Sequence, residues 1–162
     1  MKIKLYFASV LLMGFMFSTS AIANDESKNW LAVHTSEMAK MTSPTTLVMS
    51  GTREVFAFTD RPNREFKYLN THEFASLWVD ATDNGFITDP PNAVITWVQE
   101  GNLNEAEVII SNAKAISFGR GIEFSIELLT GSIPTGAELQ NVSMFLDGFE
   151  IHINPECLFN CS

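Results

Sequence analysis

The sequence contains few of the residues, and none of the motifs, on which common catalytic and metal sites depend. Only two cysteines and three histidines occur among its 162 residues. There is no G-x-S-x-G nucleophile elbow, no H-E-x-x-H pair, no C-x-x-C pair and no glycine-rich phosphate loop. The histidines, His34, His72 and His152, stand in separate segments, without a carboxylate and a nucleophile at a recognised spacing. The sequence therefore does not indicate any of the enzyme classes that these motifs mark.

Basic residues are also scarce. The chain has 10 lysines and arginines against 19 aspartates and glutamates, so its formal net charge is −9. An acidic surface repels the phosphates of nucleic acids and of anionic lipid headgroups. We therefore expect no nucleic-acid partner and no binding to a membrane surface. The charge favours solubility, and it could also attract a cationic partner.

The sequence has no apolar run long enough to span a bilayer. The apolar run Leu5–Phe17 is shorter than the roughly 20 residues that a membrane-spanning helix needs. Lysines precede this run and the small-residue segment Ala21–Ala23 follows it, which is the order of a secretory signal with its cleavage site. We predict that Met1–Ala23 is removed and leaves no stable membrane anchor. Residues 24–162 then form one domain in the periplasm or outside the cell.

Both cysteines lie in the C-terminal segment C-L-F-N-C, as Cys157 and Cys161. Two thiols this close are expected to form a disulfide in an oxidising compartment. A loop this small stabilises the fold by about 2 kcal/mol at most. The alternative is a soft-metal site built from His152, Cys157 and Cys161, in which the thiols stay reduced. The sequence indicates no other cofactor.

The hydrophobic pattern is mainly that of β-strands. In the clearest segment, Ile122, Phe124, Ile126 and Leu128 alternate with polar residues, which predicts a sheet with one wet face. The segment S-E-M-A-K-M, which follows Thr35, could extend a strand or begin a short helix. The predicted strands are Asn29–Thr35, Thr45–Ser50, Glu54–Thr59, Ala93–Gln99, Glu107–Ser111, Gly121–Leu129, Leu139–Asp147 and Phe149–Ile153, the last two joined by a tight turn at Asp147-Gly148.

One helix is predicted, over Thr71–Asp80. Asn70 is a favourable N-cap, and Glu73 stands at the spacing of a capping box. Phe74 and Trp78 belong to a single apolar stripe along this helix. The sequence therefore predicts a mainly β (α+β) fold, an antiparallel β-sandwich of about seven strands with one inserted helix.

Two polar segments resemble one another: F-T-D-R-P-N-R over Phe58–Arg64 and I-T-D-P-P-N-A over Ile87–Ala93. In a structural interpretation, Arg61 binds Asp60, Asp89 or Asp147 and clamps the loops together. In a functional interpretation, the arginines offer a positive site for a carboxylate or phosphate ligand. An enzyme could use Asp60 and Asp89 as paired carboxylates with the arginines beside them. The candidate binding residues are Asp60, Arg61, Arg64, Asp89 and Asn92.

Taken together with the intervening F-A-S-L-W and the later I-I-S-N-A and E-F-S-I-E-L-L-T-G-S-I-P, these segments resemble a group of uncharacterised secreted, mostly bacterial, proteins. That group pairs an F-[ST]-D-R-P segment with a P-P-N-A segment, and the resemblance covers about Leu47–Asp147. It implies one secreted domain and no particular activity. Ala113, where a proline is expected, and the C-L-F-N-C tail depart from the group's pattern.

The sequence thus predicts a non-catalytic binding or interaction module for a small molecule or a protein. The alternatives are an extracytoplasmic enzyme that uses Asp60 and Asp89 with Arg61 and Arg64, and a metal-handling protein that uses the C-terminal histidine and cysteines. Nothing in the sequence indicates the oligomeric state.

Overall fold

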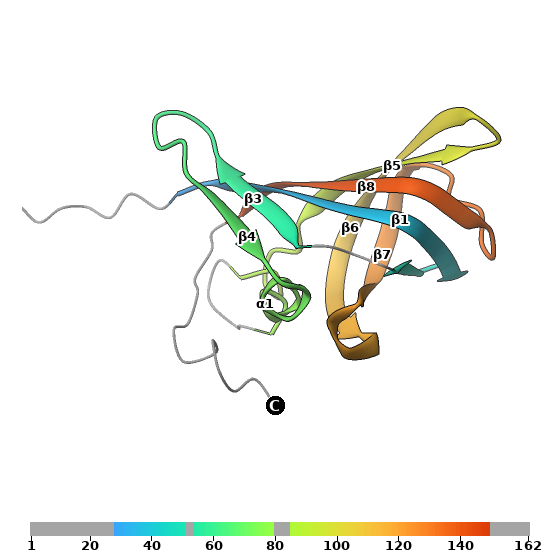
Figure 1. Cartoon of the computed structure of the whole chain (residues 1–162), viewed down its shortest axis with the longest axis horizontal. Helices are drawn as coiled ribbons and strands as arrows, with labels where there is room; N and C mark the ends of the chain where they lie inside the picture. The colour runs from blue at the N-terminus through green and yellow to red at the C-terminus, as the bar shows by residue number, and fades with distance from the viewer. Residues whose placement is uncertain (1–27, 51–53, 80–84, 150–162) are drawn as a thin grey trace, which may run out of the picture.

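The computed structural model describes residues 28–50, 54–79 and 85–149, and these are mainly β (Figure 1). The mainly β class with one small helix is confirmed. The elements are β1 (Trp30–Ser43), β2 (Thr46–Ser50), β3 (Val55–Thr59), β4 (Phe66–Leu69), α1 (Thr71–Ser76), β5 (Asn92–Gln99), β6 (Asn102–Ile116), the 3-10 turn η1 (Ser117–Gly119), β7 (Gly121–Gly131) and β8 (Glu138–Phe149).

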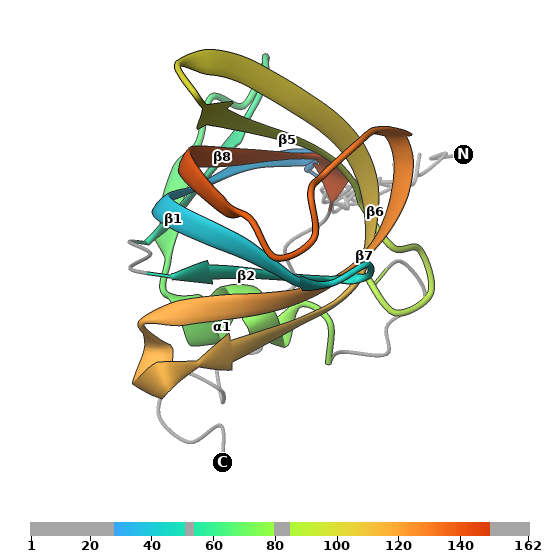
Figure 2. The same cartoon turned by 90° about the vertical axis from the view of Figure 1, so that its right-hand side faces the viewer.

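The strands form one antiparallel sheet that closes on itself. Its order is β2-β7-β6-β5-β8-β1-β3-β4, and β2 also pairs with β1. Strands β1, β2, β7, β6, β5 and β8 therefore make a closed ring (Figure 2). One edge of β1 pairs with β8, while the other edge pairs with β3 over Trp30–Val33 and with β2 over Met38–Ser43. The two walls expected of a sandwich are thus parts of one continuous sheet, and the β3–β4 hairpin extends from it.

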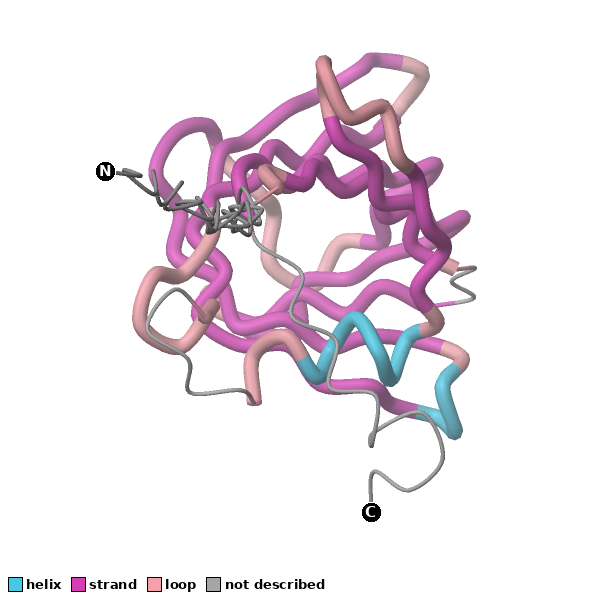
Figure 3. Tube along the Cα trace, turned by 90° about the vertical axis from the view of Figure 1, so that its left-hand side faces the viewer, coloured by secondary structure: helices cyan, strands magenta, loops and turns pink. Residues whose placement is uncertain are grey.

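Alternating side chains of the ring fill its interior. Trp97, Ile95 and Phe124 are among the largest fully buried side chains. Helix α1 packs against the inner side of the strands (Figure 3), where Phe74 is fully buried. The indole Nε1 of Trp78, in the turn after the helix, donates a hydrogen bond to the Ile110 carbonyl oxygen at 2.9 Å. The apolar stripe of α1 therefore completes the core.

The start of α1 is as expected. The Asn70 side chain accepts hydrogen bonds from the backbone N–H groups of His72 and Glu73, both at 3.0 Å. The Glu73 carboxylate accepts one from the Asn70 backbone N–H at 2.9 Å. The capping box is confirmed. The helix is shorter than predicted, because it ends at Ser76 and only turns continue to Val79.

The structure decides one open alternative and corrects two strand predictions. The segment after Thr35 continues β1 and does not form a helix. The predicted turn at Asp147-Gly148 is wrong, because β8 runs on to Phe149. Gly148 has a positive φ of 64° and lies where the register between β8 and β1 shifts, opposite Trp30–Ala32. Leu128 is predicted to lie inside but is 44% exposed, although its cross-strand partner Val108 is fully buried.

Some sequence predictions fall outside the described residues. These are the signal segment Met1–Ala23, the cysteines Cys157 and Cys161, and His152. Within the part of the chain that the structure describes, no helix is both long and apolar enough to cross a membrane.

Candidate functional site

The first polar segment forms the tip of the β3–β4 hairpin. The Thr59 N–H donates to the Glu65 carbonyl at 2.9 Å, and the Arg64 N–H donates to the Asp60 carbonyl at 3.2 Å. The Asp60 carboxylate also accepts the Arg61 backbone N–H at 2.6 Å. Residues 60–64 are all exposed, and the loop projects away from the ring of strands (Figure 1). The Asp60 carboxylate is therefore engaged by the backbone of its own turn, one residue further along the chain.

The two arginines of this tip are not used as a clamp. Arg61 and Arg64 are exposed, and their guanidinium groups make no hydrogen bond or ion pair within the described residues. The clamp interpretation is therefore wrong for this part of the chain. An ion pair at the base of the hairpin loop joins Lys28 Nζ to Glu65 Oε1 at 2.8 Å. On a strongly acidic protein, the tip carries two arginines that form no ion pair within the described residues.

The second polar segment lies at the start of β5, away from the first. The Asp89 N–H donates to the Gly85 carbonyl at 3.0 Å, and the Ile110 N–H donates to the Pro91 carbonyl at 2.9 Å, so this segment is held by backbone bonds. Asp89 and Asn92 are exposed. Strands β3 and β5 are separated by β1 and β8, which corresponds to three strand spacings, about 14 Å. The structure does not bring the two segments together as one site.

The outer face of the hairpin carries an aromatic cluster, defined here as Phe56, Phe58, Phe66 and Tyr68. Phe56 contacts the other three rings, with centroid distances of 5.5 Å to Phe58, 6.2 Å to Phe66 and 5.3 Å to Tyr68. Phe66 is 68% exposed and Tyr68 is 58% exposed. The inner residues Val55 and Ala57 are fully buried. The hairpin therefore contributes to the core with one face and presents aromatic rings to solvent with the other.

The apolar surface continues across the sheet from this cluster. Strand register places one row of neighbouring outer residues, called here the outer row: Tyr68, Phe56, Val33, Phe145 and Val94. Phe145 is 45% exposed and Val94 is 36% exposed. Cross-strand neighbours on one face lie about 5 Å apart, so the row is continuous over five strands.

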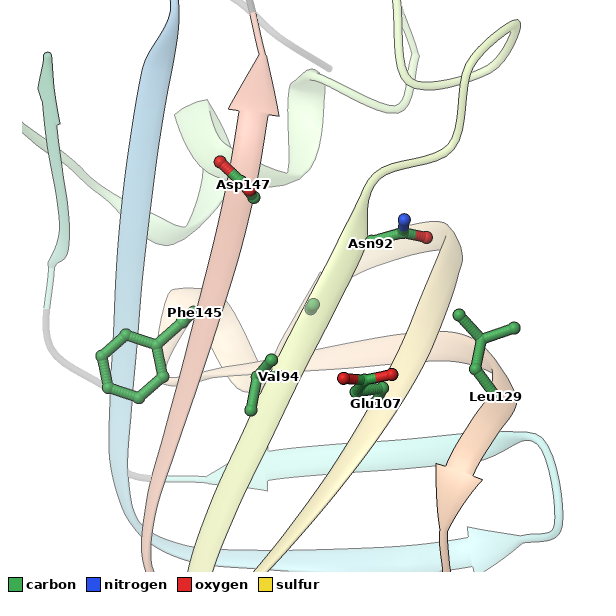
Figure 4. Close-up of a pocket in the computed structure, with 7 residues that line it drawn as sticks. Asn92, Val94, Glu107, Leu129, Phe145 and Asp147 are labelled. Atoms are coloured by element: carbon green, nitrogen blue, oxygen red, sulfur yellow. The ribbon is translucent and has the colours of Figure 1, made fainter. Parts of the chain in front are cut away.

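A shallow pocket lies at the β5 end of the outer row (Figure 4). It has a volume of about 210 Å³. Val94, Phe145 and Leu129 supply apolar walls, and three exposed polar residues, Asn92, Glu107 and Asp147, stand around them. Pockets that enclose drug-sized ligands usually measure about 300 Å³ or more. This pocket is better suited to hold one side chain of a larger partner.

The interior contains an ionisable group without a polar partner. His34 is fully buried in β1, and neither of its ring nitrogens has a hydrogen-bond partner among the described residues. Its ring lies 6.0 Å from that of Phe74 and 5.7 Å from that of Phe124. Burial lowers the pKa of His34 from 6.5 to about 4. No group of three or more histidines, cysteines or carboxylates is arranged to hold a metal within residues 28–50, 54–79 and 85–149.

Comparisons of the chain with protein-family models, with curated proteins and with solved structures gave no match. The resemblance to the group of secreted bacterial proteins stays a prediction. The site must therefore be interpreted from its own geometry.

The sequence analysis singled out the polar segment of the tip but predicted neither β4 nor the hairpin, and it therefore missed the aromatic face. Strand β4 has only four residues, F-K-Y-L, too few for a period of two to stand out. One indication was available. Phe58 and Phe66 stand at equal distances on either side of Pro62, as do Phe56 and Tyr68, and residues so placed become cross-strand partners in a hairpin.

Proposed function

We propose that this protein is a non-catalytic interaction module that works in the periplasm or outside the cell. It would bind its partner through the outer row and the arginines of the hairpin tip. The observation that carries the proposal is the continuity of the outer row, whose end residues Tyr68 and Val94 are 58% and 36% exposed. Contiguous apolar surface of this kind marks interaction sites on soluble proteins.

The composition of the surface supports the same proposal. Protein interfaces are enriched in tyrosine, phenylalanine and arginine. Arg61 and Arg64 stand beside the aromatic cluster, and no described residue engages their side chains. Residues that contribute most of the binding energy at interfaces are often arginines and aromatic residues that lie close together. A partner with carboxylates next to apolar groups would suit this surface.

The geometry favours binding over the enzyme alternative. A carboxylate pair of the glycosidase kind requires side chains within roughly 5–10 Å of each other across a substrate. Asp60 and Asp89 lie in loops beside β3 and β5, which β1 and β8 separate, and the Asp60 carboxylate binds the backbone of its own turn. The metal-handling alternative rests on His152, Cys157 and Cys161, outside the described residues. A thiol count on the exported protein tests that alternative.

A site-specific photo-crosslinking residue at position 66 or 145, in cells that export the protein, tests the proposal. We expect discrete adducts from Phe66 and Phe145, because both belong to the proposed surface. The matched control is Phe118, which is 98% exposed and lies in η1. Equal adducts from all three positions, or none from Phe66 and Phe145, would count against the proposal. The same preparation, sequenced from its N-terminus, should begin at Asn24 if the signal segment is removed as predicted.

A further inference from the structure

Strand β4 is the last strand of the sheet, and the backbone groups along its outer edge could bind another strand. In the described residues β4 pairs with β3 on one side and with no strand on the other, whereas the six strands of the ring leave no such end. An unpaired strand edge exposes backbone N–H and C=O groups that can pair with another extended segment. Binding at this edge rests on the proposed interaction function and narrows it to one kind of partner.

The register of the hairpin shows which backbone groups of β4 face outward. The Thr59 N–H donates to the Glu65 carbonyl and the Glu65 N–H donates to the Thr59 hydroxyl, so Thr59 and Glu65 stand in a hydrogen-bonded position with their backbone groups facing each other. Such pairs alternate along an antiparallel ladder with pairs whose N–H and C=O groups point away from each other. Phe66 pairs with Phe58 and Tyr68 pairs with Phe56, so both fall in the second class. The N–H and C=O groups of Phe66 and Tyr68 therefore point to the open edge.

The side chains at this edge match the backbone pattern. Phe66 and Tyr68, which carry the outward backbone groups, are the most exposed aromatic residues of the cluster. Lys67 lies between them, on the other face of the hairpin and partly buried. Its ammonium group has no hydrogen bond or ion pair within the described part of the chain. An added strand would meet an apolar, a positive and an apolar position in succession.

A second copy of this chain fits the edge poorly. An antiparallel pair of two β4 strands that uses all four outward groups must place Phe66 opposite Tyr68 of the second copy. The two Lys67 side chains then face each other across the strands. Like charges in directly opposite positions destabilise a pair, and lysine on an edge strand is a known protection against self-association. The net charge of −9 on each copy adds to the repulsion.

We infer that the open edge of β4 binds an extended segment of a different protein, which adds to the sheet as an antiparallel strand and carries a carboxylate opposite Lys67 between two apolar residues opposite Phe66 and Tyr68. Main-chain hydrogen bonds hold such a segment, and the side-chain pockets select it. Arg61 and Arg64, just before β4, favour further carboxylates toward the end of the segment nearest the tip.

The test uses the purified exported protein and a capped, fluorescent peptide, Ser-Thr-Val-Glu-Val-Thr-Ser, with fluorescence anisotropy as the readout. The control peptide has lysine in place of glutamate. We expect the wild type to bind the glutamate peptide about five- to tenfold more tightly than the lysine peptide. Lys67→Glu should reverse this preference, because the charge opposite the central residue is then negative. A reversal of this kind cannot arise from a general loss of folding.

A second pair of variants tests the backbone contacts. Tyr68→Pro removes an outward-facing N–H but leaves the hydrogen bonds to β3, and Tyr68→Thr removes the ring alone. We expect Tyr68→Pro to weaken peptide binding about tenfold more than Tyr68→Thr, with thermal midpoints of the two variants compared as the check on folding.

Three results would overturn the inference. The first is that the glutamate peptide does not bind. The second is that neither Lys67→Glu nor Tyr68→Pro changes the affinity for the peptide. The third is that the protein forms a concentration-dependent dimer that Tyr68→Pro abolishes. If any of these occurs while position 66 still crosslinks a partner in cells, strand addition is wrong and the proposed function stands. If position 66 crosslinks nothing as well, both fail.

Discussion

Replacement of the buried His34 tests the structure of the interior most directly. In the folded protein its imidazole is surrounded by Phe74 and Phe124, and its pKa is lowered from 6.5 to about 4 by burial. In the unfolded chain the pKa is near 6.5. Between pH 6.5 and pH 4 the unfolded state therefore binds a proton that the folded state does not. The free energy of unfolding must rise with pH in this window and fall as the pH is lowered.

The size of the effect follows from the shift. Each pH unit inside the window changes the free energy of unfolding by about 1.36 kcal/mol for one proton. The difference between 6.5 and about 4 then amounts to about 3 kcal/mol over the whole window. At pH 5, about 2 kcal/mol of this has been lost relative to pH 7. Below about pH 4 both states are protonated, and His34 no longer contributes to the slope.

Urea unfolding at half-unit steps from pH 7.5 to pH 4 measures this contribution. We expect His34→Met to remove about 3 kcal/mol of the pH dependence, because the replacement has no group that titrates. The carboxylates titrate in both proteins and cancel in the difference. His72→Gln is the control, since His72 is an exposed histidine in the first turn of α1, and it should keep the wild-type slope. A His34→Met protein with the same pH dependence as the wild type would refute the buried, unpartnered placement of the ring.

Two further predictions concern the hairpin tip and the helix start. Arg61→Ala should leave the thermal midpoint within about 2 °C of the wild type, because the guanidinium group has no partner within the described residues; a fall of about 10 °C would restore the clamp interpretation. Asn70→Ala should cost about 1 kcal/mol, or about 3 °C, because two N–H groups lose their acceptor. Asn63→Ala, in the exposed loop, should not move the midpoint, and equal losses from both replacements would contradict the role of the capping box.

The sequence predicts elements well where local chemistry decides them. Asn70 and Glu73 cap α1 as their spacing predicts, since both partners of the capping box lie within one turn. The alternation of Ile122, Phe124 and Ile126 correctly places these residues inside. These features depend on residues that are close together in the sequence, so they can be inferred from the sequence alone.

Other features depend on partners that are distant in sequence. Gly148 continues a strand because the pairing of β8 with β1 accommodates the irregularity. The closure of the sheet depends on β2 pairing with β1 as well as with β7. The candidate site has the same limitation: the acid and arginines of the tip are visible in the sequence, whereas the outer row draws one residue from each of five strands.

The position of β1 in the ring also constrains how the chain can fold. This strand lies near the start of the described residues, yet one of its edges pairs along most of its length with β8, near their end, as in the pair Thr35 and Ser143. Contacts between distant segments form slowly, because the loop between them must close first. Until β8 has been synthesised and released from the ribosome, β1 and β5 lack a shared neighbour and the interior stays open. A chain that stops before Glu138 would therefore be expected to remain unfolded and to expose strand edges that promote aggregation.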